Sequence, residues 1–445
     1  MNKTLTLVKN EGDLPEALQQ AVDIEMSTIP IYLYTYYSLI RVPNQTQIQS
    51  DYANRYINEG MDINEAAQKS LNRSVDFMVF ANKAGATIMS VAVEEMLHMA
   101  LASNLYRALV GMPKLVGRSP EGFPVNLPGR VPPLSIPLAS FSSVQMQHFI
   151  DIESPSKPLL KAIPMDWTSI GDFYNAILKY IDEEVKDEDF KKDAPQLGPG
   201  NAYYAHNNVN TMYYNRYHKP VFTNGNPEWN QKVANDEPEK EDGPGDLVYI
   251  VDKKTARKAI KIIVDQGEGI DATHTMDDAS KNEESHYRKF LDLKAELDAQ
   301  FTAEDLKYFV KQFPDNPTTA NYPADVQAVS NMVNAVYTYM YMLMDACYRN
   351  PLIQQKEIFN FGMHKGMIFV LSTLCDFITS IKLPNGLYAA PTFENYEFAS
   401  TSTAKSQLLA LYNQIPASLN PPSSIPGRLS NMPDVSSIPG QAVSL

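Results

Sequence analysis

The amino-acid sequence predicts an all-α protein whose centre is a four-helix bundle, and two observations lead to this fold class. The first is a pair of Glu-x-x-His motifs, and the second is a lone glutamate on an earlier apolar segment before each motif. Bundles that hold two metal ions have this order, with one Glu from each of two helices and a Glu-x-x-His from each of the other two. The residues are Glu25, Glu95, His98, Glu268, Glu283 and His286.

Apolar residues surround these six side chains at the helical spacing of 3.6 residues. Each of four segments therefore has one apolar stripe, and the polar residues of the pattern fall on that stripe. The stripes include Leu18, Val22, Glu25 and Ile29; Val91, Glu95, His98 and Ala102; Ile260, Val264 and Glu268; and Glu283, His286 and Phe290. All six side chains are thus expected to point into the core.

The predicted elements begin with a helix from about residue 13 to 40, with Asp13 as its cap and Pro15 in its first turn. A second helix covers about 75–110 and ends at a Gly-Met-Pro sequence. The interval of about 114–250 is rich in Pro, Asn and Gly, so it is expected to be a long, largely irregular insertion with one clear helix near 168–184.

Helices resume at about 252–268 and 277–300, and these two complete the expected bundle. Two additional C-terminal helices are predicted at about 323–348 and 353–382. We expect one domain over residues 1–400, followed by a C-terminal extension at 401–445 whose Pro/Ser-rich sequence lacks a core of its own.

Six polar side chains in a core indicate a metal site, because an isolated buried carboxylate is unfavourable unless a cation or another partner compensates its charge. Carboxylates together with imidazoles favour iron, most simply as a di-iron pair, and manganese and zinc are the alternatives. Glu94 competes with Glu95, since it lies four residues before His98, but the three-residue spacing of the second motif favours Glu95. Glu268 has the weakest assignment, because flanking glycines place it at a helix end.

The charge and hydropathy of the sequence limit the kinds of partner that this protein can bind. The formal net charge of -14 argues against nucleic acid or an anionic membrane surface. The sequence has neither an apolar run of about 18 residues nor a signal peptide, so a cytoplasmic protein without membrane contact is expected. A Tyr-rich run at 201–220 either lines the mouth of an active site or anchors its own loop, and the first reading favours a small-molecule substrate. The sequence also allows a homo-oligomer.

The sequence resembles the ferritin-like domain of the iminophenyl-pyruvate dimer synthases, a family related to the imine-coupling enzymes of violacein and rebeccamycin biosynthesis. The resemblance covers roughly residues 14–395. It implies a ferritin-like fold, iron bound at the six residues above, and oxidative coupling of two imines derived from aromatic α-keto or amino acids. It rests on LPEALQQAVDIEMSTIPIYLYTYYSL, SVAVEEMLHMALASNLYRALVGMPKL, SIGDFYNAI, AIKIIVDQGEGI, SHYRKF and LPNGLYAAPTFE.

The sequence therefore predicts a metal-dependent, most simply di-iron, oxidoreductase that acts on a small aromatic or amino-acid-derived substrate. One alternative is a ferroxidase or iron-binding protein that uses the same ligands. A second is a metal-free helical binding or scaffold protein, in which the six polar residues form a hydrogen-bonded network. No catalytic residue is assigned.

Overall fold

The computed structural model describes residues 13–155, 169–198, 247–269, 285–359, 362 and 365–439. The described residues are mostly helical, and the strands among them are β1 (Val125–Asn126) and β2 (Ser135–Ile136), which form one short antiparallel pair. The predicted all-α fold class is confirmed. None of the described helices combines the length and the apolar character that a membrane crossing needs.

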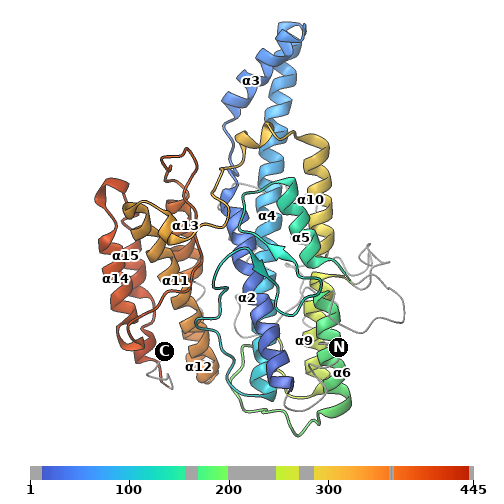
Figure 1. Ribbon diagram of the computed structural model, residues 1–445, viewed down its shortest axis with the longest axis vertical. Coiled ribbons are helices and arrows are strands. Elements are labelled where there is room, and N and C mark those ends of the chain that lie inside the picture. The colour runs from blue at the N-terminus through green and yellow to red at the C-terminus, as the bar shows by residue number, and fades with distance from the viewer. Residues whose placement is uncertain are drawn as a thin grey trace.

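Two long helices, α2 (Leu14–Ser38) and α4 (Ile63–Leu109), pack along each other through the centre of the molecule (Figure 1). Every residue is buried from 24 to 38 in α2 and from 88 to 105 in α4. A helix buried on all sides lies inside a larger protein, with other elements covering it. The N-terminal end of α4 extends beyond the bundle, and α3 (Gln45–Asn58) packs on it there.

Four shorter helices form the other half of the bundle (Figure 1). Here α5 (Ser143–Glu153) pairs with α10 (His286–Gln300), and below them α6 (Ile170–Glu184) pairs with α9 (Lys253–Gly267). A side-chain cap from Ser or Asp starts each of the four helices. The half made of α2 and α4, here called the unbroken half, has two continuous helices. The half made of α5, α6, α9 and α10, here called the broken half, has helices that end near the middle of the bundle.

Both α5 and α6 belong to the interval of 114–250 that was expected to be a largely irregular insertion. The helix predicted near 168–184 is present as α6, whereas α5 was not predicted. The helix predicted at 252–268 is α9, and the described part of the one predicted at 277–300 is α10. The insertion thus contributes helices to the bundle itself.

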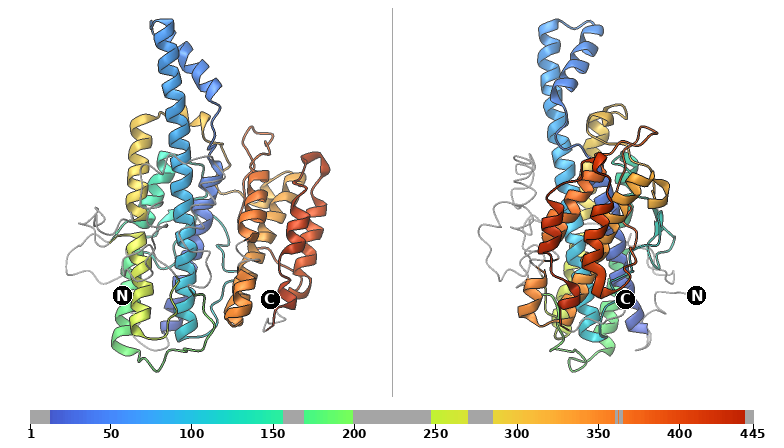
Figure 2. Two further views of the ribbon diagram at one scale, coloured as in Figure 1. Left: turned by 180° about the vertical axis from the view of Figure 1, so that it is seen from behind. Right: turned by 90° about the vertical axis from the view of Figure 1, so that its left-hand side faces the viewer.

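A C-terminal layer packs beside α2 and α4 (Figure 2). Its central helix is α11 (Ala324–Arg349), which matches the helix predicted at 323–348. The prediction at 353–382 corresponds to α12 (Leu352–Glu357), a π-helical turn (Gly366–Leu371) and α13 (Ser372–Ile378). Residues 401–445 contribute α14 (Ala404–Gln414) and α15 (Ile425–Asn431), and α14 packs on α11. Short 3₁₀ helices lie at Asp305–Tyr308, Thr319–Asn321, Thr401–Thr403, Ala417–Leu419 and Val435–Ser437.

Candidate metal centre

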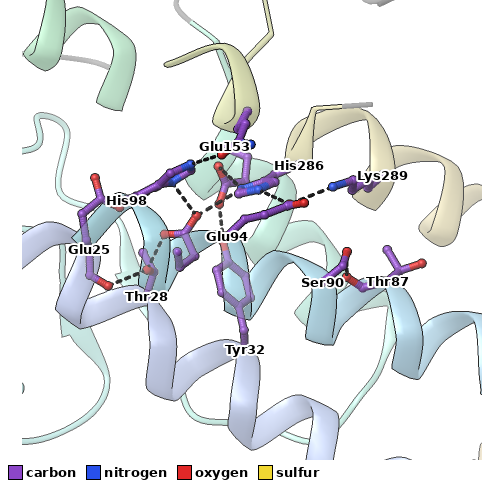
Figure 3. A network of polar contacts seen from close by, with 12 residues as sticks. Glu25, Thr28, Tyr32, Thr87, Ser90, Glu94, His98, Glu153, His286 and Lys289 are labelled. Carbon is purple, nitrogen blue, oxygen red and sulfur yellow. Dashed lines mark hydrogen bonds and ion pairs between the residues drawn. The ribbon is translucent and has the colours of Figure 1, made fainter. Parts of the chain in front are cut away.

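Five buried side chains meet where α2, α4, α5 and α10 approach one another (Figure 3). They form two groups that share Glu95, and within each group the possible donor atoms lie within 4.8 Å of one another. None of the five residues is more than 2% exposed. The first group is Glu25, Glu95 and His98, and the second is Glu95, Glu153 and His286.

The two groups are supplied by different kinds of local structure. Glu25 lies in the middle of α2, and Glu95 and His98 lie three residues apart in the middle of α4, so one helical face carries both. In contrast, Glu153 is the last residue of α5 and His286 is the first residue of α10. The side chain of Ser285 caps α10 by accepting a hydrogen bond from the backbone N–H of Arg288.

Glu95 stands between the two imidazole rings. Its Oε1 lies 3.4 Å from Nδ1 of His98 and 3.1 Å from Nδ1 of His286. On the outer sides, Oε2 of Glu25 is 3.8 Å from Nδ1 of His98, and Oε2 of Glu153 is 3.6 Å from Nδ1 of His286. The two rings stack with their centroids 5.4 Å apart. The arrangement is therefore nearly symmetric about the Glu95 carboxylate.

Each carboxylate of the cluster is oriented by a hydroxyl group that donates to its other oxygen. Thr28 Oγ1 donates to Oε2 of Glu95 over 2.6 Å, and the Tyr174 hydroxyl donates to Oε1 of Glu25 over 2.5 Å. The Tyr32 hydroxyl donates to Oε1 of Glu153. Each glutamate consequently keeps one oxygen fixed and directs the other toward the imidazoles.

The outer nitrogen of each ring has a partner as well. Nε2 of His98 lies 2.9 Å from Oε1 of Gln266, and Nε2 of His286 lies 2.8 Å from Oε2 of Glu94. The same Glu94 oxygen accepts a hydrogen bond from Lys289 Nζ over 2.8 Å. With the Nε2 atoms engaged, both rings present Nδ1 to the cluster. Glu94, which competed with Glu95 in the sequence, thus contacts His286.

The electrostatics of the cluster reflect crowded, buried carboxylates. Burial, followed by the nearby charge of Glu95, raises the pKa of Glu25 well above its usual range. Burial also favours the neutral form of Glu95, but the adjacent imidazoles of His286 and His98 outweigh it and hold its pKa below the usual range. Burial acts to lower the pKa of His286, but the nearby carboxylates, with the charge of Glu153 first among them, outweigh burial and raise this pKa well above its usual value.

The donor set fits a pair of metal ions. Buried carboxylates in close contact repel one another, and cations between them would compensate that repulsion. In addition, Nδ1 of His286 is buried and has no hydrogen-bond partner of suitable direction among the described residues, although two carboxylate oxygens lie within 3.6 Å. An imidazole nitrogen in this state is positioned to bind a cation.

The structure brings together four of the six residues that the sequence singled out, Glu25, Glu95, His98 and His286. It places Glu268 in neither group. Glu268 follows the last residue of α9, and its carboxylate accepts hydrogen bonds from the Gly171 N–H over 2.5 Å and from Ser169 Oγ over 3.2 Å. Its burial raises its pKa to about 8. Glu283 lies outside the described residues, as does the Tyr-rich run at 201–220.

The sequence analysis did not select Glu153, which the structure groups with Glu95 and His286. A signal for a helix was present, because Met146, Phe149, Ile150 and Glu153 follow one another at helical spacing, but this spacing does not mark Glu153 as a ligand. It lies in an interval whose abundant Pro and Gly suggested irregular structure. The stripe containing Glu268 does not reveal that α9 ends at Gly267 and that its helical face does not continue.

Residues 18–295 match the family described as ferritin-like. The 2-imino-3-(indol-3-yl)propanoate dimerase of Chromobacterium violaceum is 24% identical over 306 residues, which cover 66% of this chain and 24% of that protein. The chain therefore spans about a quarter of the length of this relative. A crystal structure of a ferritin-like protein from Caulobacter vibrioides aligns with a TM-score of 0.44 and 16% identity, over 86% of this chain and 97% of that one.

Proposed function

The chain belongs to the ferritin-like family, and from this premise we propose that it is a metal-dependent oxidoreductase with a di-iron centre. The proposed ligands are Glu25, Glu95, His98, Glu153 and His286. The observation that supports the proposal best is the sharing of Glu95 by two three-residue groups, because a central carboxylate can bridge two ions. Mixed oxygen and imidazole donors suit iron, and manganese or zinc would use the same donors.

Iron bound here would supply the oxidising chemistry, and the protein's own residues would define where that chemistry happens. Thr28, Tyr32 and Tyr174 hold the carboxylates in position by donating hydrogen bonds to them. The apolar surfaces of α2 and α4 exclude water from the ligands, which strengthens the electrostatic interactions among them. With Nε2 engaged by their outer partners, the two imidazoles keep Nδ1 directed toward the centre.

We further propose that the substrate is a small aromatic or amino-acid-derived molecule and that the reaction is an oxidative imine coupling. The similarity to a protein named as an imine dimerase supports this assignment.

The metal centre is tested by measuring metals in the purified protein. We expect about two equivalents of metal per chain after loading with Fe(II) without oxygen, as in other two-metal bundles. Glu95→Ala should reduce this to less than about half an equivalent, because it removes the shared ligand. The matched control is Glu65→Ala, which alters an exposed glutamate at the start of the same helix and should leave the metal content unchanged. Normal metal loading in Glu95→Ala would refute the centre.

The reaction class is tested by following oxygen consumption by the iron-loaded protein. An oxidase should consume oxygen when an aromatic α-keto acid is supplied together with ammonium, because these condense to the imine with loss of water and without consuming oxygen themselves. The Glu95→Ala variant should lose this activity. Oxygen consumption driven by Fe(II) alone, and unaffected by the organic substrate, would instead identify a ferroxidase or an iron-storage protein.

A further inference from the structure

The two halves of the centre differ in what contacts the outer nitrogen of each imidazole. His98 faces the amide oxygen of Gln266 at 2.9 Å, whereas His286 faces a carboxylate oxygen of Glu94 at 2.8 Å. All of these side chains are nearly fully buried, with Glu94 only 6% and Gln266 only 4% exposed. A nearly symmetric set of ligands therefore has one neutral and one acidic outer partner.

Lys289 fixes the charge of the acidic partner. Its Nζ donates to the Glu94 oxygen that also contacts His286, over 2.8 Å, and the lysine is itself only 5% exposed. Lys289 lies three residues after His286, so the first turn of α10 carries both groups that contact Glu94. A buried ammonium and a buried carboxylate in contact each favour the charged form of the other.

A charged outer partner changes how strongly an imidazole binds a metal. When the outer N–H donates to a carboxylate, electron density moves toward the other ring nitrogen and the ring becomes a stronger ligand. An amide oxygen accepts the same hydrogen bond with less effect, because it carries no formal charge. Changes to such outer partners typically alter metal affinity by about 10–100-fold.

We infer that the two metal positions are unequal: the one at His286, strengthened by Glu94, which Lys289 keeps ionised, binds its ion more tightly than the one at His98, which has Gln266. This inference rests on the proposed function, since it requires both positions to bind metal. Glu94, Lys289 and Gln266 act as positioning residues, through the imidazoles and not by contact with the ion.

The test is a titration of metal-free protein with Mn(II), with free Mn(II) measured by electron paramagnetic resonance. The wild type should show one tight and one weak site, with affinities at least about tenfold apart. Single ligand deletions then identify the sites. Glu25→Ala should retain the tight site, and Glu153→Ala should retain the weak one, because each glutamate belongs to one group only.

The deciding variant combines Glu94→Gln with Lys289→Met, so that no unpaired charge is left in the core. We expect the affinity of the tight site to fall by about 10–100-fold toward that of the weak site, which should itself be unchanged. The matched control is Lys83→Met with Glu296→Gln. It removes another ion pair between α4 and α10, of 2.6 Å, that does not contact the rings.

A second variant keeps the test independent of how well the double variant folds. Gln266→Glu gives His98 an acidic outer partner and should tighten the weak site. Two sites of equal affinity in the wild type would overturn the inference and leave the proposed centre intact, and so would an equal loss at both sites in the double variant. No Mn(II) binding by the wild type would overturn both.

Discussion

The two halves of the candidate centre are built differently although their ligands are nearly symmetric. Glu25, Glu95 and His98 lie in the middle of two unbroken helices, where the helical repeat and dense packing fix their positions. Glu153 and His286 lie at the ends of two short helices, where caps and hydrogen bonds determine the geometry. A ligand in an unbroken helix can therefore be found from spacing alone. Of the two residues at helix ends, His286 was found from its Glu-x-x-His motif, whereas Glu153 is brought to the site by tertiary contacts that spacing does not show.

Helix ends near the centre are also joined to one another. The carboxylate of Glu268, just after the end of α9, accepts hydrogen bonds from residues at the start of α6. A carboxylate at a helix N-terminus satisfies backbone N–H groups that have no partner within the helix. Glu268 thus connects α9 with α6, and we propose that this connection, and not the metal binding expected from the sequence, is its role.

The largest expected effect tests whether Glu153, and not Glu268, binds metal at the position of His286. Glu153→Gln should weaken binding at the position of His286 by about 100-fold or more, because it replaces a charged ligand by a neutral amide. Glu268→Gln, the matched substitution at the residue that the sequence favoured, should change metal affinity by less than about threefold. Mn(II) titration of both variants measures the difference. A larger loss in Glu268→Gln would restore the original assignment.

Much of the fold and four of the five proposed ligands could be predicted, because α2 and α4 are long and regular and because His286 belongs to a second Glu-x-x-His motif. The stripes of α2 and α4 place Glu25, Glu95 and His98 on the correct faces without any knowledge of other helices. Glu153 could not be ranked above other acidic residues, because α5 has only 11 residues and its place beside α10 is a long-range contact. Periodicity also gives no information about which helix continues past a glycine, so the stripe of Glu268 does not show that α9 ends at Gly267.

The second prediction concerns pH and the joint between α9 and α6. The pKa of Glu268 is raised to about 8 by burial, so the folded protein retains a proton that the unfolded chain loses above about pH 4.3. Stability from this group is complete below about pH 4.3 and is lost as pH rises to about 8. Relative to Glu268→Gln, the wild type should lose about 2.5 kcal/mol of unfolding free energy between about pH 5 and 7. Urea denaturation at several pH values measures this, and parallel pH profiles would contradict it.

A third prediction uses the tyrosines that connect the two halves. Tyr32 of α2 donates to Glu153 of the broken half, and Tyr174 of α6 donates to Glu25 of the unbroken half. Tyr32→Phe should weaken the position at His286 by about tenfold, and Tyr174→Phe should weaken the position at His98 by a similar factor. Both substitutions keep the ring and remove only the hydroxyl. If either variant affected both positions equally in the Mn(II) titration, the halves would not be separable.

The smallest effect is expected at the surface of the broken half. Arg257 of α9 forms an ion pair of 2.7 Å with Asp182 of α6, and the arginine side chain is 60% exposed. Water and salt screen such a pair, so Arg257→Ala should lower the free energy of unfolding by less than about 1 kcal/mol. Buried apolar residues on both helices, such as Ile177 and Ile263, should keep α6 and α9 together. A loss above about 2 kcal/mol in urea denaturation, diminished by added salt, would show that charge and not burial holds this half in place.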